Sequence, residues 1–102
     1  MVVLSWPILR EFSKQHPDAA NALKDWYQQV SLADWRTLAN VRQFSNTVDY
    51  VGNFRYVFNI RGNRYRLIAA ILFSTHTVFV KFIGTHQEYD AIDAATIDYS
   101  KP

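Results

Sequence analysis

The sequence predicts an α+β domain in which N-terminal helices pack on a mostly antiparallel sheet of three to four strands, followed by a short C-terminal helix. The chain has 102 residues, which is the size of one domain, so residues 1–102 are expected to share a single core. Apolar residues recur at helical spacing in the first half. The second half is rich in Val, Ile, Phe and Tyr, with short breaks that favour hairpins.

The beginning of the chain predicts a short strand and a helix. Residues 1–4 are apolar and could add a strand to the sheet. Ser5 can cap a helix that has Pro7 in its first turn. This helix should stop near His16 and Pro17, because proline disfavours the helical conformation in the residue before it.

Two further helices are expected before the sheet. The second one starts at Asp18 and has an apolar stripe made by Ala19, Leu23, Trp26, Tyr27 and Val30. Ser31 with Asp34 three residues later resembles a capping arrangement. The sequence therefore predicts a third, short helix that ends near Asn40.

Four strands are predicted in the second half, at residues 48–51, 54–60, 64–73 and 77–84. The third of them is apolar on both faces in its middle, which predicts that it is a central strand of the sheet. Residues 86–94 then indicate a short helix, and residues 98–102 are expected to fray.

Composition excludes several classes of protein. With 49% hydrophobic and 20% charged residues, the chain resembles an ordinary globular protein rather than a disordered one. There are no cysteines, so disulfides and thiolate sites are excluded. The longest apolar runs are too short to span a membrane, and no signal-peptide pattern is present, so a cytoplasmic protein without membrane contact is expected.

Charge is unevenly distributed along the chain. Residues 1–51 carry five basic and five acidic side chains, whereas residues 52–86 contain no Asp or Glu. That second stretch holds Arg55, Arg61, Arg64, Arg66 and Lys81. Such a stretch should attract a polyanion, although carboxylates are in any case depleted in strands.

Four of these cations suggest a phosphate-binding site. Arg66 begins the central strand, and Lys81 stands between the apolar residues Phe79 and Ile83, two positions away on either side. Arg61 and Arg64 flank the predicted Gly62-Asn63 turn, so several cations could converge at one end of the sheet. The alternative is that each cation reaches from a strand end to water.

His86 and Tyr89 are the candidates for proton transfer. They lie three residues apart at the start of the last helix, and imidazole titrates near neutral pH. His16 and His76 are interpreted as surface residues.

No metal or other cofactor is expected. Histidines at ligand spacing and a Gly-rich phosphate loop are both missing from the sequence, and Glu88 and Asp90 stand alone. Metal-free chemistry on a phosphodiester remains, and RNA suits it because its own 2′-hydroxyl can attack the phosphate. A basic, aromatic sheet is equally compatible with binding RNA or a ribosome without cutting, and exposed aromatics could instead cover a partner helix.

Two segments of the second half are distinctive: FNIRGNRYRLIAAI from Phe58 to Ile71 and FIGTHQEYD from Phe82 to Asp90. They resemble HigB-type toxins of bacterial type II toxin-antitoxin systems, a family within the RelE-like mRNA interferases. The similarity extends upstream to Ala22-Leu23, Trp26-Tyr27, Val30 and Trp35, so it covers most of the chain. It departs from the family at Lys81, often an arginine, and at Phe44-Ser45-Asn46, often Phe-Pro-Ser.

The resemblance implies a RelE-like fold and an endoribonuclease that cleaves mRNA, commonly on translating ribosomes. It also implies a helix-turn-helix antitoxin of the HigA type as partner. Carried over to this sequence, the catalytic site would consist of Arg66, Lys81, His86 and Tyr89. Asn63 and Arg61 or Arg64 would shape the RNA groove. Cleavage of mRNA by such a toxin would inhibit translation and arrest growth.

Overall fold

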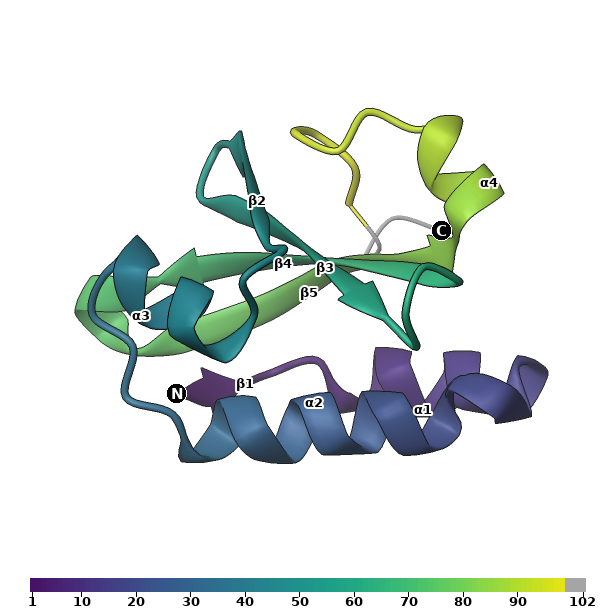
Figure 1. Ribbon diagram of the computed structural model, residues 1–102, viewed down its shortest axis with the longest axis horizontal. Coiled ribbons are helices and arrows are strands. Elements are labelled where there is room, and N and C mark those ends of the chain that lie inside the picture. The colour runs from purple at the N-terminus through teal and green to yellow at the C-terminus, as the bar shows by residue number, and fades with distance from the viewer. Residues whose placement is uncertain (99–102) are drawn as a thin grey trace.

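A five-stranded sheet separates two layers in the computed structural model, which describes residues 1–98 (Figure 1). The strand order is β1-β5-β4-β3-β2, and every neighbouring pair is antiparallel except β1 with β5. The strands are β1 (Val2–Val3), β2 (Asp49–Gly52), β3 (Arg55–Ile60), β4 (Tyr65–Leu72) and β5 (Thr77–Thr85). The helices are α1 (Trp6–Gln15), α2 (Ala20–Leu32), α3 (Leu38–Phe44) and α4 (His86–Asp90), with 3-10 turns η1 (Pro17–Ala19) and η2 (Phe73–Thr75).

The predicted fold class is confirmed, with one strand more than expected. The extra strand is β1, which the apolar segment at residues 1–4 had suggested. β4 is the middle strand, as its two apolar faces predict. On one face Leu67, Ala69 and Ile71 join the main core, and on the other Ile68 belongs to a smaller cluster.

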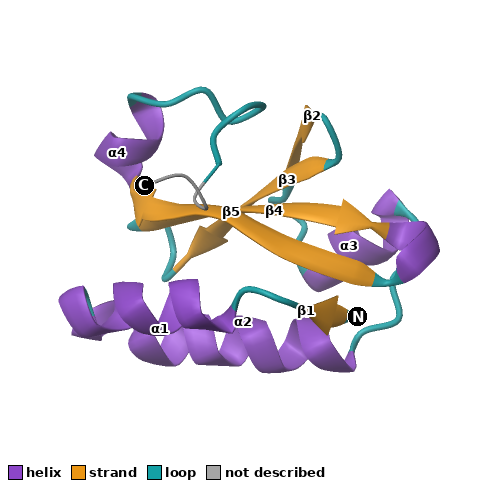
Figure 2. Ribbon diagram, turned by 180° about the vertical axis from the view of Figure 1, so that it is seen from behind, coloured by secondary structure: helices purple, strands orange, loops and turns teal. Residues whose placement is uncertain are grey.

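The two layers differ in what covers the sheet. Helices α1 and α2 lie side by side under the face of the main core, whereas α4 and the segment after it lie on the opposite side (Figures 1 and 2). Apolar side chains of that segment pack on the smaller cluster, including Ile92 and Ile97. None of the described helices is long and apolar enough to cross a membrane.

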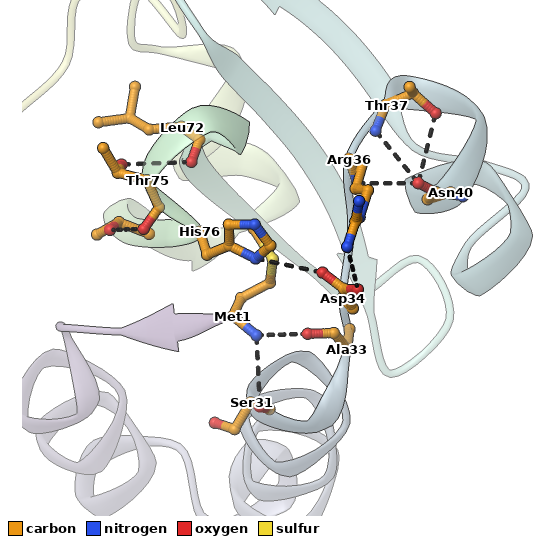
Figure 3. A network of polar contacts seen from close by, with 11 residues as sticks. Met1, Ser31, Ala33, Asp34, Arg36, Thr37, Asn40, Leu72, Thr75 and His76 are labelled. Carbon is orange, nitrogen blue, oxygen red and sulfur yellow. Dashed lines mark hydrogen bonds and ion pairs between the residues drawn. The ribbon is translucent and has the colours of Figure 1, made fainter.

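The predicted third helix is wrong in its position. Ser31 lies inside α2, where its hydroxyl donates to the Tyr27 carbonyl at 2.7 Å, so it does not cap a new helix. α3 begins after Thr37, where Asn40 Oδ1 accepts the Thr37 backbone N–H at 3.2 Å (Figure 3). Asn40 therefore stands near the start of α3 and not at its end.

A β-bulge interrupts β5 at Lys81. Ile68 is the register partner of Phe82 and Ala69 that of Val80, so Lys81 is the extra residue. The bulge reverses the alternation: Val80 and Ile83 both belong to the main core, whereas Phe82 points to the smaller cluster. Although Ile83 is two residues from Lys81, the simple alternation of a regular strand therefore does not hold between them.

The C-terminal segment is held on the sheet by hydrogen bonds from β3 and the turn before it. Arg55 is 6% exposed, and its guanidinium donates to the carbonyls of Ala94, at 3.3 Å, and of Ile97. The Asn53 side chain donates to the Ala95 carbonyl at 3.0 Å. Asp98, where fraying was expected to begin, lies 4.0 Å from Lys81 Nζ, and the rest of that expected segment lies outside the described residues.

Ser5 extends the edge of the sheet rather than capping α1. It occupies the position before the helix, but its side chain makes no capping bond there. Its Oγ instead accepts the Val80 backbone N–H at 2.8 Å, next to the parallel pairing of β1 with β5. The hydroxyl thus satisfies a buried strand N–H beyond the end of β1.

Replacement of Ser5 by alanine should leave that N–H buried without a partner and lower the free energy of unfolding by about 1–3 kcal/mol. Ser13→Ala is the matched control, because the Ser13 hydroxyl only donates to a carbonyl of its own helix. It should change stability by less than about 0.5 kcal/mol. Urea unfolding of both variants measures the difference, and equal losses would contradict this role of Ser5.

Candidate functional site

The β3–β4 turn, at residues 61–64, forms one wall of the site. Arg61 and Gly62 have φ angles of 52° and 64°, in the left-handed region. Glycine adopts this conformation without a Cβ penalty, whereas Arg61 does so at some cost. The Arg64 N–H donates to the Arg61 carbonyl at 3.3 Å and closes the turn. The turn predicted from Gly62-Asn63 is confirmed.

Asp18 ties this turn to the helical layer. Its Oδ2 accepts hydrogen bonds from Arg61 and Arg64, both at 2.8 Å, and its Oδ1 accepts from the Tyr65 hydroxyl at 2.6 Å. The Tyr65 hydrogen bond, followed by the two arginines, lowers the pKa of Asp18, and the same hydrogen bond raises the pKa of Tyr65. Asp18, which lies far upstream in the sequence, therefore neutralises part of the positive charge of residues 52–86, the stretch that contains no Asp or Glu.

Arg66 is held in a fixed orientation beside the turn. Its Nη2 donates to Asn63 Oδ1 at 2.8 Å and its Nη1 to the Asn63 carbonyl at 3.4 Å. Its Cζ lies 6.0 Å from the centre of the Tyr89 ring, within the range of a cation–π contact. A guanidinium fixed on one side by Asn63 has further N–H groups with which to bind phosphate oxygens.

His86 is oriented by a carboxylate on its own helix. Its Nδ1 lies 3.0 Å from Asp90 Oδ2, and its backbone N–H donates to the Arg64 carbonyl at 3.1 Å. An ionised carboxylate only accepts, so Nδ1 carries the hydrogen, and Nε2 is left to take up or release a proton. The side chain is 46% exposed, which leaves it accessible to substrate.

Helix α4 is fixed at its start by a capping box. Thr85 Oγ1 accepts the Glu88 N–H at 3.1 Å, and Glu88 Oε1 accepts the Thr85 N–H at 2.8 Å. Both carboxylates of this helix thus have local partners: Glu88 bonds the Thr85 N–H, and Asp90 lies against His86. Each of them orders the helix that carries His86 and Tyr89.

Lys81 is apart from the other predicted catalytic residues. Arg66 is paired with Gly84 on β5, and Lys81 lies three residues before Gly84. Three residues of strand correspond to about 10 Å, so the backbone of Lys81 is about that far from the position opposite Arg66. Its side chain is 27% exposed, and its Nζ lies near Asp98 and 5.7 Å from the centre of the Phe79 ring. Among the predicted residues, side-chain contacts of Arg66 join Asn63 and Tyr89 to it. The backbone hydrogen bond from His86 to the Arg64 carbonyl holds the start of α4 against the same turn.

Two residues near this group were not predicted as part of it. Asp18 was placed at a helix start, and nothing local indicates that it reaches the turn. Asp90 follows His86 by four residues, a helical spacing that could have indicated the pair.

His16 was interpreted as a surface residue, but its side chain is half-buried. Its ring lies 4.3 Å from that of Phe12 and 5.5 Å from that of Tyr65.

Within residues 1–98, no group of three or more His, Asp or Glu side chains is placed to hold a metal ion. The arrangement offers a fixed guanidinium, an oriented imidazole and a phenol around one patch of surface. These groups can bind a phosphate, transfer a proton and contact a base.

Comparison with known proteins identifies the family. The family model of HigB toxins, described as the RelE-like toxic component of a toxin-antitoxin system, matches residues 19–92. The chain belongs to the HigB toxin family. It is 32% identical over 97 residues to the mRNA interferase HigB of Escherichia coli O6:H1, covering 90% of this chain and 91% of that protein. It is also 38% identical over 39 residues to the mRNA interferase toxin HigB of Escherichia coli K12, covering 38% of each chain. The matched residues of the HigB family model include the β3–β4 turn, Arg66 and α4, and the match ends at residue 92.

The Asp18 contacts predict a specific dependence of stability on pH. Because the pKa of Asp18 is lowered from 3.8 by folding, its contribution to stability is present above about pH 4 and is lost as the pH falls through the lower, folded-state pKa. Asp18→Asn should therefore be less stable than wild type at pH 7, and the difference should shrink on acidification below pH 4. Thermal unfolding at pH 7, 4 and 3 measures this, with the exposed Asp49→Asn as control. A difference that stayed constant over this range would refute it.

Proposed function

We propose that this HigB-family chain is an endoribonuclease that cleaves mRNA, with Arg66, His86 and Tyr89 as catalytic residues. The observation that carries the proposal is the fixed Arg66 guanidinium beside Tyr89, which belongs to the same short helix, α4, as the His86–Asp90 pair. Relatives named mRNA interferases support RNA as the substrate. Arg61, Asn63 and Arg64 would bind the RNA along the β3–β4 turn.

In this mechanism the RNA supplies its own nucleophile. The 2′-oxygen attacks the adjacent phosphorus as its proton passes to His86 Nε2, and the bond from phosphorus to the 5′-oxygen breaks. The leaving 5′-oxygen takes up a proton either from the Tyr89 hydroxyl or, where Tyr89 instead stacks on a base, from water. Arg66 stabilises the charge that develops on the phosphorane-like transition state. The products are a 2′,3′-cyclic phosphate and a 5′-hydroxyl, and no metal ion takes part.

Lys81 has a supporting role in this proposal. Its distance along the strand from Gly84 and its contact with Asp98 favour His86 over Lys81 as the principal proton carrier. Lys81 would add positive charge to the face over which the RNA passes. Its single ammonium cannot bind a phosphate bidentately as the arginine of related toxins can.

The proposal also places the reaction in the cell. The substrate would be mRNA on translating ribosomes in the cytoplasm, and cleavage would stop translation and growth. A helix-turn-helix antitoxin of the HigA type would bind and silence the toxin. The family description, which names a toxin-antitoxin system, supports the existence of such a protein partner.

His86→Ala should abolish cleavage, with a loss of about 10²–10⁴-fold in rate, because it removes the general base. Binding of RNA should change little, since the arginines remain. Primer extension on a reporter mRNA in a translating extract measures cleavage, and filter binding measures affinity for RNA.

His76→Ala is the matched control for this experiment. His76 also pairs with an aspartate, at 3.2 Å from Asp34, and its side chain is likewise 46% exposed (Figure 3). It lies at the opposite end of β5, so cleavage should be unchanged. If His86→Ala cleaved mRNA at the rate of the wild-type chain, His86 would have no part in the mechanism. Binding without any cleavage by wild type would favour a non-catalytic RNA-binding module instead.

A further inference from the structure

Phe79 of β5 lies on the same face of the sheet as Arg66. Its neighbours Val78 and Val80 belong to the main core, which α1 and α2 cover, so Phe79 points to the opposite face (Figure 2). In β4, Arg66 and Ala70 likewise alternate with residues of the main core. Ala70 is the register partner of Phe79 and follows Arg66 by four residues, which corresponds to about 13 Å of strand. The ring of Phe79 is therefore further along the face that carries the proposed cleavage site.

Apolar side chains at the edge of the sheet extend this surface around Phe79. Val2 and Leu4 stand on either side of the buried Val3, so both point to the face of Phe79. The Leu4 N–H donates to the Val78 carbonyl at 3.1 Å, which places Leu4 beside Phe79. Val2 is 55% and Leu4 56% exposed, and Phe79 is half-buried. Apolar side chains that are exposed as a group, rather than singly, indicate an interaction surface.

A cation lies close to the Phe79 ring. Lys81 Nζ is 5.7 Å from the ring centre, within the range of a cation–π contact. Lys81 is the extra residue of the β5 bulge, so alternation alone does not fix its side, and the contact with Phe79 shows that its ammonium is on this face. Its other neighbour is the carboxylate of Asp98, at 4.0 Å. A ring that can stack on a base and a cation that can pair with a phosphate together make up sites for single-stranded nucleic acid.

Charge and continuity with the proposed cleavage site favour RNA as the occupant of this surface. Lys81 and Arg66 both belong to residues 52–86, which contain no Asp or Glu, and both point to this face. RNA held at Arg66 and extending along β5 would pass over Lys81 and then over Phe79. Asp98 is the carboxylate that a phosphate would displace from Lys81. The cations would then attract the backbone of the RNA while the ring contacts a base.

We propose that Phe79 stacks on one base of the RNA substrate, a few nucleotides from the cleaved phosphate, and that Lys81 binds a phosphate beside that base. The inference rests on the proposed function, because it extends the RNA-binding face beyond Arg66, but it concerns binding and is tested without cleavage. The side chains next to the ring are apolar at Leu4 and Ala70, so the base is held by its flat face rather than by hydrogen bonds to its edge. This position should therefore accept all four bases.

Two oligonucleotides of equal charge separate stacking from electrostatic attraction. One consists of 2′-O-methyladenosine, which has no free 2′-hydroxyl and therefore resists cleavage by the proposed mechanism. The other has the same length and the same phosphates but carries no bases. Fluorescence anisotropy of an end-labelled oligonucleotide measures the affinity of the full chain for each. Wild type should bind the adenine oligonucleotide more tightly than the base-free one.

Phe79→Leu should weaken binding of the adenine oligonucleotide about tenfold and leave binding of the base-free one unchanged, because a leucine side chain is apolar but cannot stack. Phe79→Tyr keeps a ring and should bind as wild type does. Phe44→Leu is the matched control, since Phe44 is 38% exposed and contacts Phe58 of the main core, on the opposite face. Lys81→Gln should weaken binding of both oligonucleotides by the same factor and reduce its dependence on salt.

Equal affinities of wild type and Phe79→Leu for the adenine oligonucleotide would overturn the inference, and the apolar surface around Phe79 would then be left to a protein partner. An equal loss for both oligonucleotides would also overturn it, because the ring would then act only through the fold. If binding depends on Phe79 as expected but wild type cleaves no mRNA, the stacking site stands and the proposed function fails. If wild type cleaves mRNA while Phe79→Leu binds and cleaves as wild type does, the function stands and the inference fails.

Discussion

The carboxylate of Asp18 is the interaction on which the arrangement of the site depends. It accepts hydrogen bonds from two arginines of the β3–β4 turn and from the Tyr65 hydroxyl at the start of β4. A turn with a left-handed arginine has a strained backbone, and three bonds to one fixed acceptor hold it in place. Because Asn63 belongs to this turn and orients Arg66, the position of the guanidinium follows from that of Asp18.

This constraint also shapes the charge of the surface. Arg61 and Arg64 share one negative charge, so together with Asp18 they carry a net charge of one rather than two. Arg66 is bonded by the neutral side chain of Asn63 and keeps its full positive charge for a substrate. In the proposed function this difference in charge would favour a phosphate at Arg66 and a looser, screened attraction of RNA along the turn.

Features that depend on local pattern were predictable from the sequence. β4 was recognised as the central strand because both of its faces are apolar, and the turn was recognised from Gly62-Asn63. Features that depend on distant partners were not. Asp18 and Arg61 are separated by 43 residues, and no spacing rule connects them. The bulge at Lys81 reverses the faces of β5 without interrupting its run of apolar residues, so simple alternation cannot show to which side Ile83 points.

Capping patterns were the least reliable local signal. Ser31 had a suitable residue three positions later, yet α2 continues through it, because a serine hydroxyl can also bond the preceding turn of its own helix. Ser5 stands at a helix start, yet its hydroxyl serves a strand. In both cases a single polar side chain has several possible partners, near or far along the chain, and the tertiary structure selects among them.

The chemistry of the RNA ends tests the central claim most directly. Purified wild-type chain is added to a translating extract, and the cleaved mRNA is examined for the groups at each new end. Attack by the 2′-hydroxyl predicts a 5′-hydroxyl, which polynucleotide kinase labels without prior phosphatase treatment, and a 2′,3′-cyclic phosphate on the upstream fragment. New ends that carry a 5′-phosphate would mean that water attacked the phosphorus and that the bond to the 3′-oxygen broke. That outcome would contradict the mechanism built on Arg66, His86 and Tyr89.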